Sequence, residues 1–398
     1  MHIAYLSPAW PPRGAANGVV TYVSVIRDYL LREGHDVSVL SQGMLHRADG
    51  STHALDAPGA MPFWSRMAAR IDRRLGHHPF TGRRMADQWR RARGVAAFDL
   101  IEMEESFGWC DTVRRRVDVP VVTRLHGPQF LKPTGGDTVT SPAHARDRER
   151  AEARAIRLAG ALSAPTGVIL DATRTRYRAA LGKVIPNPVA SVAPRDRWRL
   201  DACNRDMILC VGRLDRLKGA DTMLAAFAQL LARRPTARLT MVGPDGGYVR
   251  ADGTTIAFAE HAAATFDPAT LSRVTFAGLL DRDAIAALRR QAFVTVVASA
   301  CENFPYAAVE AMAAGSPLVT TDWLGAAEIV TDGTTGWLTP VGDAPAMAER
   351  LAWLFERPDA AAHAGAQGWL RCREDFGVER VGARMVDFYR EILARHRS

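Results

Sequence analysis

The hydrophobic positions along the chain form short apolar runs separated by longer stretches with helical spacing. In the first half, runs rich in β-branched and aromatic residues predict strands at 2–7, 36–41, 98–103, 120–126 and 161–164. Between them, apolar residues recur every three or four positions and predict helices at 18–32, 106–116 and 145–158. Strands that alternate with helices are typical of a parallel sheet covered by helices.

A second series of the same kind predicts strands at 207–212, 238–243, 274–278, 293–299 and 317–321. Between the two series, prolines 186, 188 and 194 break both periodicities, so we place a hinge at 184–197. The pattern therefore predicts an α/β protein with two doubly wound parallel-sheet domains, at 1–186 and 187–375. Residues 376–398 have apolar residues at helical spacing and predict a closing helix with one apolar face.

Charge is distributed unevenly between the two halves. Residues 1–186 carry 27 Lys and Arg against 18 Asp and Glu, whereas residues 187–398 carry 24 against 25. The positive potential of the first half favours an anionic partner or surface. The five cysteines are scattered without a C-x-x-C pair, and the sequence has neither a signal-peptide pattern nor a membrane-spanning apolar run. We therefore expect a cytoplasmic protein with reduced thiols.

Two cations follow the first strand of the second series. In the stretch VGRLDRLKGAD, residues 211–221, a strand that ends at Gly212 leads through a short segment toward a helix. Arg213 and Lys218 lie on that segment, at the carboxyl end of the predicted sheet, where open α/β folds bind ligands. Two cations there suit a diphosphate, although two solvent-facing basic side chains would give the same pattern.

Two carboxylates mark the stretch CENFPYAAVEAMAAGSPLVTTDWLGAAE, residues 301–328. Glu302 follows an apolar strand, and a helix is predicted to begin near Pro305, because proline is preorganised for a first helical turn. The N–H groups of that turn can hold a phosphate, and a nearby carboxylate can accept hydrogen bonds from sugar hydroxyls. Glu310 lies in an apolar run, where a buried carboxylate needs a partner.

Together these stretches resemble the donor-binding domain of the family 4 retaining glycosyltransferases of the GT-B fold. The resemblance rests on the spacing E-x7-E from Glu302 to Glu310, on its continuation EAMAAGSPLV and on GRLDRLKG. It extends to PPRGAANGVVTYV, HGP and IPNPV, while FGVERVGARMVDFY resembles the segment of that family that returns to the N-terminal domain. The resemblance implies two Rossmann-like domains that face a central cleft, the first for the acceptor and the second for a nucleotide-sugar donor.

The resemblance also implies roles for individual residues of the second half. Arg213 and Lys218 would neutralise the donor diphosphate and stabilise the departing nucleoside diphosphate. Glu302 would bind the transferred sugar, and Glu310 would hold the ribose. The other donor-binding positions implied in this half contribute backbone or loop geometry: Gly243, Gly278, Asn303, Phe304 and Pro305.

In the first half, the resemblance implies that His126 contacts the donor sugar and that Gly18 lets the N-terminal loop approach the phosphates. His126 follows the strand PVVTRL. That position alone would favour a structural histidine, and the resemblance reverses the preference. The chain departs from many members of the family where Asn17, Asn303 and Pro305 stand in place of glycines, and Pro305 has no N–H to donate to a phosphate.

The expected activity is transfer of a hexose-type sugar from a UDP- or GDP-linked donor to a glycan, lipid-linked or small-molecule acceptor. Bacterial cell-surface polysaccharide or glycoconjugate synthesis is the expected setting. Retention by double displacement needs a carboxylate nucleophile beside an acid, and the motifs offer no second carboxylate for it. Front-face substitution is instead implied by the resemblance. A sugar-nucleotide epimerase or phosphorylase on the same scaffold, or a non-catalytic sugar-nucleotide-binding protein, remains an alternative.

No metal or other cofactor is expected. Asp281 and Asp283 spell the D-x-D of metal-dependent glycosyltransferases, but they follow a predicted strand and open the helical stretch AIAALRRQ. A helix N-cap with an acid in the first turn explains the pair more simply.

Residues 64–94 contain nine arginines against only two acids, Asp72 and Asp87. Apolar residues are interleaved with them: Trp64, Met67, Ile71, Leu75, Phe80 and Trp89. Such a segment either lies on an anionic membrane surface, which would suit a lipid-linked acceptor, or forms two helices with solvated basic faces. Specific nucleic-acid binding is not expected, because no nucleic-acid motif accompanies the arginines.

Overall fold

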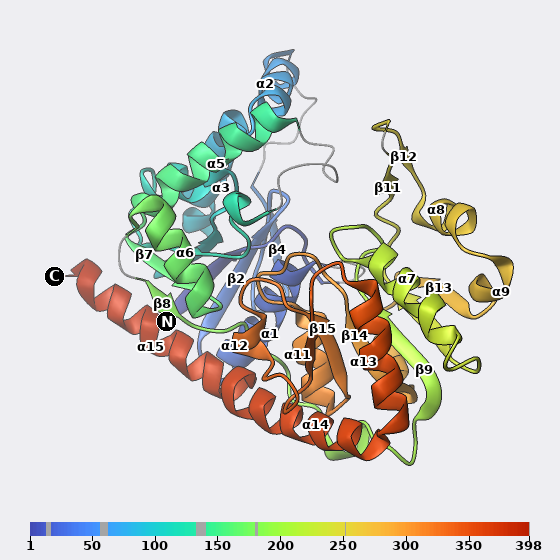
Figure 1. The fold of residues 1–398 in the computed structure, drawn as a ribbon. Helices are drawn as coiled ribbons and strands as arrows, with labels where there is room; N and C mark the ends of the chain where they lie inside the picture. The colour runs from blue at the N-terminus through green and yellow to red at the C-terminus, as the bar shows by residue number, and fades with distance from the viewer. Residues whose placement is uncertain (13–16, 56–62, 133–140, 180–181, 251, 398) are drawn as a thin grey trace. The chain divides into compact units, whose positions relative to one another are not determined.

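The chain forms two compact units in the computed structural model, which describes residues 1–12, 17–55, 63–132, 141–179, 182–250 and 252–397. The first unit comprises most of residues 1–188 together with Val378–Ser398, and the second is Val189–Gly377. Each unit is a sheet covered by helices (Figure 1). Among the described residues, no helix is both long and apolar enough to cross a membrane.

The sheet of the first unit has the strand order β4-β3-β2-β1-β5-β6-β7-β8 within the described ranges. Its strands are β1 (His2–Leu6), β2 (Asp36–Ser41), β3 (Met44–His46), β4 (Thr52–Ala54), β5 (Leu100–Glu104), β6 (Val121–Arg124), β7 (Ala161–Ala164) and β8 (Lys183–Val184). The strands from β2 to β8 in this order run parallel. β3 and β4 are antiparallel, and the hydrophobic pattern does not predict them.

The antiparallel edge begins at a two-residue turn between β2 and β3. Gln42 and Gly43 both have positive φ angles, 50° and 80°. Two consecutive residues of this kind form the tight hairpin turn whose twist matches that of paired strands. The apolar periodicity reports burial rather than turn geometry, so it does not reveal this hairpin.

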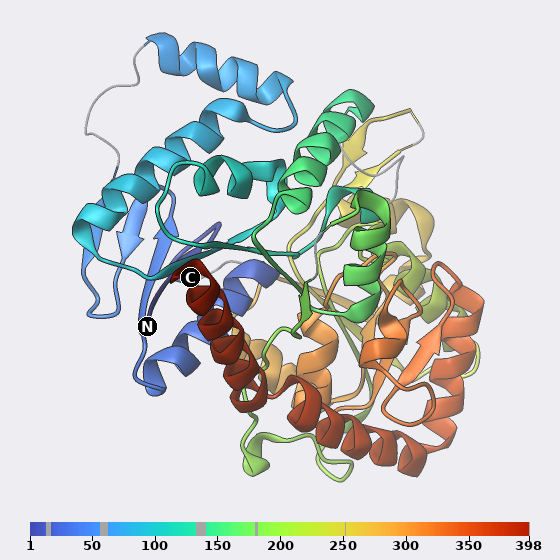
Figure 2. The same cartoon turned by 90° about the vertical axis from the view of Figure 1, so that its left-hand side faces the viewer.

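The helices of the first unit are α1 (Gly18–Arg32), α2 (Phe63–Arg74), α3 (Pro79–Val95), α4 (Trp109–Arg114), α5 (Pro142–Arg157), α6 (Gly167–Tyr177) and α15 (Val378–Arg397). The predicted helix at 106–116 is divided, because Phe107 has a φ of 57° between a 3₁₀ turn and α4. α15 packs against α1 (Figure 2), and a Cβ at Gly382 would lie 2.3 Å from the Tyr29 ring. The closing helix therefore belongs to the first unit.

The sheet of the second unit is parallel, with the order β13-β10-β9-β14-β15-β16 in the part of the chain that the structure describes. Its strands are β9 (Asn204–Val211), β10 (Arg238–Val242), β13 (Val274–Gly278), β14 (Ala292–Val297), β15 (Leu318–Thr321) and β16 (Trp337–Thr339). A separate antiparallel hairpin, β11 (Tyr248–Val249) and β12 (Thr255–Ile256), stands beside α8 (Figure 1).

The helices of the second unit are α7 (Ala220–Leu231), α8 (Phe258–Thr265), α9 (Pro268–Leu271), α10 (Arg282–Gln291), α11 (Tyr306–Ala314), α12 (Ala326–Ile329), α13 (Ala344–Glu356) and α14 (Pro358–Arg371). They cover both faces of the sheet. Ile208 and Cys210 of β9 join the core with α7 and α13, whereas Met207 and Leu209 join the cluster with α10. Because side chains alternate along a strand, this continuous apolar run serves two cores.

Candidate functional site

Three strand ends of the second unit are tied together where the predicted donor loops begin. The Gly212 N–H donates to Val242 O at 2.9 Å, and the Gly243 N–H donates to Gly278 O at 2.9 Å. The carboxyl ends of β9, β10 and β13 therefore meet at Gly243 and Gly278. The loops that follow these strands, with Arg213, Lys218, Gly243 and Gly278, therefore lie at the edge of the sheet at which this architecture binds ligands.

Two glycines allow the loops at this edge to approach closely. A Cβ at Gly219, where φ is +67°, would lie 1.8 Å from Ala298 O, and a Cβ at Gly243 would lie 2.0 Å from Gly212 O. No side chain fits at those distances. The segment Gly212–Gly219 is thereby held against the end of β14.

Lys218 and Glu302 form an ion pair at this edge. Lys218 Nζ lies 2.6 Å from Glu302 Oε1, and the Ser299 hydroxyl donates to the same oxygen at 2.7 Å. The Glu302 side chain is only 13% exposed, so its charge is compensated by Lys218 and Ser299 rather than by water. Lys218, the residue predicted to bind the diphosphate, and Glu302, the residue predicted to bind the sugar, are thus adjacent.

Asp215 fixes the two cations of the motif relative to each other. Its Oδ1 accepts a hydrogen bond from the Lys218 N–H at 2.8 Å, and its Oδ2 pairs with Arg213 Nε. One carboxylate therefore closes the turn that carries Lys218 and orients the Arg213 guanidinium. The Arg213 side chain remains 48% exposed, so it is accessible to a ligand.

Glu310 belongs to a separate ion pair. Its Oε2 accepts a hydrogen bond from Arg289 Nη2 at 3.1 Å, and Arg289 is almost completely buried. The sequence analysis predicts a partner for a carboxylate in this apolar run, and that partner is Arg289 of α10. The structure thus joins Arg213, Lys218 and Glu302 through shared hydrogen bonds, whereas Glu310 has a partner of its own.

The loop that precedes α11 is anchored by its aromatic side chain. Phe304 is 7% exposed and packs edge-on against Phe376 at 5.6 Å. Pro305 is the N-cap of α11, which has no side-chain cap. The Phe304 ring therefore faces the core of the second unit.

In the first unit, His126 follows β6 and is held by an aromatic contact. Its ring lies 5.1 Å from that of Tyr22 on α1, in an edge-to-face arrangement. Burial, together with the positive charge of Arg124, holds the pKa of the His126 imidazole well below its usual value. The ring is therefore neutral at neutral pH, which suits a hydrogen bond to a sugar hydroxyl.

Glu105 holds the backbone on which His126 is mounted. Its two carboxylate oxygens accept hydrogen bonds from the N–H groups of His126 and Gly127, both at 2.8 Å, and the residue has no exposed surface. Burial, with the charges of Glu152 and Glu104 nearby, raises the pKa of the Glu105 carboxyl to about 8.

A buried polar network lies beneath this region. Glu102 accepts hydrogen bonds from Tyr22 at 2.6 Å and from Tyr389 of α15 at 2.8 Å. The Arg124 guanidinium lies 4.4 Å from the Tyr22 ring centroid and donates to Asn187 at 2.6 Å. Residues from the beginning, middle and end of the chain therefore meet in the first unit.

Gly18, the predicted loop glycine, is the first residue of α1. Asn17 is the helix N-cap, and its side chain accepts hydrogen bonds from Val19 N at 2.8 Å and Val20 N at 3.4 Å. The asparagine side chain thus caps the first turn of α1. Residues 13–16 of the same stretch lie outside the described residues.

The D-x-D sequence is a helix cap, as predicted. Asp281 Oδ1 accepts a hydrogen bond from the Ala284 N–H at 2.8 Å at the start of α10, and Asp283 lies in the first turn. Across the described residues, no group of three or more His, Cys, Asp or Glu side chains is arranged to hold a metal ion.

The Arg-rich segment forms α2 and α3. Trp89 is completely buried, packed at 5.6 Å against Phe98, so it is not available for insertion into a membrane surface. Its size and position on the inner face of α3 make it part of the core. Met67, Ile71 and Phe80 are 37–40% exposed. The side chain of Trp64 lies outside the described residues.

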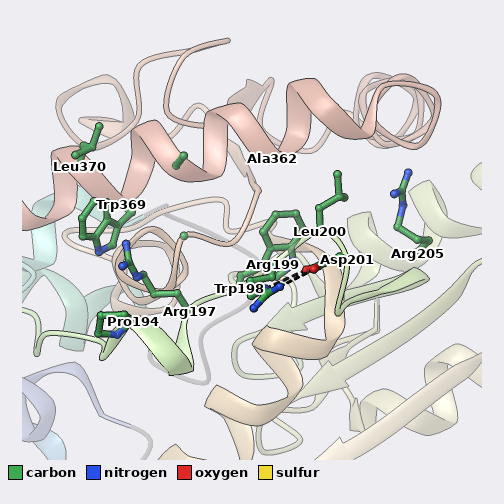
Figure 3. A pocket seen from close by; sticks show the side chains of 12 residues that line it. Pro194, Arg197, Trp198, Arg199, Leu200, Asp201, Arg205, Ala362, Trp369 and Leu370 are labelled. Carbon is green, nitrogen blue, oxygen red and sulfur yellow. Dashed lines mark hydrogen bonds and ion pairs between the residues drawn. The ribbon is translucent and has the colours of Figure 1, made fainter.

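A hollow of about 870 Å³ lies elsewhere in the second unit (Figure 3). It opens between α14 and the segment that leads into β9, and Trp198, Trp369 and Arg197 are among its lining residues. That is the amino end of β9, opposite to Gly212, and none of the predicted donor residues lines it. The hollow therefore has no part in the donor site.

Sequence reasoning missed several residues that organise these sites. They are Asp215, Arg289, Ser299, Glu105, Tyr22 and Arg124. Asp215 lies inside the motif, and its position three residues before Lys218 is a turn-capping signal that could have identified it. The partners in the first unit are distant in sequence, and no local pattern indicates them.

Comparison with known proteins agrees with this architecture. The model of the family described as "Glycosyltransferase Family 4" matches residues 16–191, and that described as "Glycosyl transferases group 1" matches residues 194–369. D-inositol 3-phosphate glycosyltransferase of Streptomyces avermitilis is 30% identical over 309 residues, covering 73% of this chain and 64% of the relative. The enzyme of that name from Nocardiopsis dassonvillei is 30% identical over 305 residues, covering 70% and 67%. The matched region thus spans about two thirds of these relatives.

Two solved structures share the fold over nearly the whole chain. Sucrose-phosphate synthase from Thermosynechococcus elongatus has a TM-score of 0.77 at 23% identity and covers 99% of both chains. Anabaena Alr3699/HepE, in complex with UDP and glucose, has a TM-score of 0.66 at 18% identity and covers 97% of this chain and 98% of its own. With its two parallel-sheet units and both family models matched, the chain belongs to the family 4 glycosyltransferases and has the GT-B fold.

Proposed function

We propose that the protein transfers a hexose-type sugar, with retention of configuration, from a UDP- or GDP-linked donor to a hydroxyl of a glycan, lipid-linked or small-molecule acceptor. The observation that carries the proposal is the connected set of charges at the carboxyl end of β9 and β14. Lys218 lies 2.6 Å from Glu302, and Asp215 links Lys218 to Arg213. Relatives and neighbours that are named for sugar transfer, or that hold UDP, support a nucleotide-sugar donor.

The charges suggest how such a donor would be accommodated. Lys218 and Glu302 compensate each other in the structure, so a ligand must offer both of them a new partner. A sugar diphosphate does so, because its phosphates attract Lys218 and its hydroxyls donate to Glu302. As the glycosidic bond breaks, negative charge grows on the departing diphosphate, and Lys218 and the accessible Arg213 stabilise it.

His126 would supply a neutral hydrogen-bonding group for the transferred sugar. Its lowered pKa keeps the imidazole uncharged, so it adds no repulsion against a developing positive charge at the anomeric carbon. Neither mechanism nor binding in this proposal uses a metal ion, since Asp281 is engaged as a helix cap. Front-face substitution, with the departing phosphate oxygen assisting deprotonation of the acceptor, remains the proposed route to retention.

Product analysis tests the proposal. A panel of UDP- and GDP-sugars is incubated with and without saccharide and lipid-linked acceptors, and nucleoside diphosphate release and the anomeric configuration are measured by NMR. Acceptor-dependent release with retained configuration is expected, unchanged by excess chelator. Isomerised nucleotide-sugar without acceptor would identify an epimerase instead. Release that requires inorganic phosphate would identify a phosphorylase, and an inverted product or chelator-sensitive turnover would contradict the proposed mechanism.

Two matched variants test the charges at the site. Lys218→Met should lower kcat by about 10²-fold to 10³-fold, the cost of removing one stabiliser of transition-state charge. Arg216→Met, in the same turn, is the control, because it also removes one positive charge and Arg216 pairs with Asp221 at 3.5 Å. Equal kcat values for the two variants would contradict the role given to Lys218.

We also propose that α2 and α3 contact an anionic membrane surface, at the cytoplasmic face, where a lipid-linked acceptor would lie. Exposed Met67, Ile71 and Phe80 stand among exposed arginines. Each Arg near such a surface contributes about 1 kcal/mol. Sedimentation with phosphatidylglycerol vesicles should show binding that weakens with salt and with the double variant Met67→Ser, Ile71→Ser. No binding at low salt would contradict the proposal.

A further inference from the structure

A buried guanidinium lies behind the carboxylate that is proposed to hold the donor ribose. The Arg289 side chain, on α10, is 6% exposed, and its Nη2 donates to Glu310 Oε2 at 3.1 Å. α10 precedes β14 and α11 follows it, and the two helices are neighbours. The pair therefore joins consecutive helices of the second unit.

The contact uses only one oxygen of the carboxylate. The Glu310 side chain is 30% exposed, and among the described residues no hydrogen bond reaches its Oε1. A charge-assisted bond at Oε2 restricts rotation of the carboxylate, so Oε1 keeps its acceptor positions in a fixed direction. In the Glu310 carboxylate, Oε2 is thus anchored by Arg289, and Oε1 is available to a ligand.

The guanidinium itself is incompletely satisfied. Arg289 Nε is buried and has no hydrogen-bond partner within the described part of the chain. The guanidinium therefore anchors Glu310 through Nη2, and its Nε adds no second hydrogen bond to the carboxylate.

A purely structural ion pair is the competing explanation. A buried arginine is costly without an opposite charge, and Glu310 provides one whether or not a nucleotide binds. Under that explanation Arg289 affects stability alone, and its loss in a folded variant leaves the ratio of ribose-form to deoxy-form affinity unchanged. A role in ribose recognition differs because it depends on the hydroxyls of the ligand.

We propose that Arg289 is a positioning residue for ribose recognition: it anchors Glu310 Oε2 so that Oε1 accepts hydrogen bonds from the 2′- and 3′-hydroxyls of the donor nucleotide. The inference rests on the proposed function of Glu310 and deepens it. Arg289 makes no contact with the substrate in this arrangement and acts through the carboxylate.

Binding of UDP, GDP and their 2′-deoxy forms, measured by isothermal titration, tests the proposal. The two forms differ by a hydrogen bond to a charged group, so the wild type should bind the ribose form about tenfold or more tightly than the deoxy form. Arg289→Met should reduce that ratio to about threefold or less and leave the affinity for the deoxy form unchanged. Glu310→Gln should reduce the ratio similarly, and the double variant should reduce it no further.

Arg290→Met is the matched control, because Arg290 is the next residue of α10, is more exposed and approaches Asp196 only at 3.9 Å. It should keep the full ribose preference. Arg289→Lys retains the positive charge but lacks the planar, forked guanidinium. If the methionine variant does not fold, the lysine variant should show an intermediate ratio of ribose-form to deoxy-form affinity. Thermal unfolding verifies that each variant is folded.

The outcomes separate the inference from the function on which it rests. If the wild type binds no nucleotide, or if Glu310→Gln keeps the full ribose preference, the proposed role of Glu310 is wrong. If Glu310→Gln loses the preference while folded Arg289 variants keep it, Arg289 belongs to a structural ion pair and only this inference is overturned.

Discussion

Replacement of Glu105 by glutamine should change the stability of the first unit in a way that depends on pH. The carboxyl group is buried with a pKa of about 8, whereas its value in an unfolded chain is near 4.5. Below pH 4.5 it is protonated in both states, and its contribution to stability is fully present. As the pH rises toward 8, the unfolded chain releases this proton and the folded chain keeps it, so folding loses up to about 1.4 kcal/mol per pH unit.

Glutamine does not titrate, so the variant lacks this loss. At pH 5 we expect Glu105→Gln to be less stable than the wild type by about 1–3 kcal/mol, because its amide nitrogen cannot accept from His126 or Gly127. Between pH 5 and pH 7.5 the difference should shift by about 3 kcal/mol in favour of the variant. At pH 7.5 the variant should therefore be as stable as the wild type or more stable by up to about 2 kcal/mol.

Urea unfolding at pH 5, 6 and 7.5 measures this shift, with hydrogen exchange of the β5 and β6 amides reporting on the first unit. Glu149→Gln is the control, because Glu149 lies on α5, is partly exposed and pairs with Arg176 at 2.6 Å. Its difference from the wild type should stay constant over the same range. A constant difference for Glu105→Gln as well would refute the assignment of a raised pKa to this carboxyl.

Three further substitutions test packing and hydrogen bonding. Gly219→Ala should lower the free energy of unfolding, measured by urea denaturation, by about 3 kcal/mol or more, because its Cβ would lie 1.8 Å from a backbone oxygen at a φ of +67°. Gly212→Ala is the control. Its nearest contact would be at 3.7 Å, so it should cost less than half as much in the same assay. Tyr22→Phe leaves Glu102 without a 2.6 Å hydrogen bond and should cost about 1–3 kcal/mol in urea unfolding, and no loss would mean that water replaces the hydroxyl. Trp89→Ala should cost about 3–5 kcal/mol by the same measurement, and a loss below 1 kcal/mol would contradict its place in the core.

Local patterns were sufficient for much of the fold. Strands such as β9 and β14 contain mainly apolar, buried runs, and the helices between them repeat at helical spacing, because burial on a sheet or along a helix face imposes those periods. The edge hairpin of β3 and the division of the helix at Phe107 were missed. Both depend on positive φ angles, which are local backbone states that hydrophobicity does not report.

The candidate site divides in the same way. The sequence by itself determined that Arg213, Lys218 and Glu302 follow strand ends and that Glu310 lies inside a helix, because motif spacing within one element is a local property. Only the tertiary structure decided the partner of each charge, such as Glu302 for Lys218 and Arg289 for Glu310. Partners 84 or 21 positions apart meet only after helices and strands have packed. A buried charged side chain pairs with whichever oppositely charged side chain the packed fold places next to it, whatever their separation along the chain.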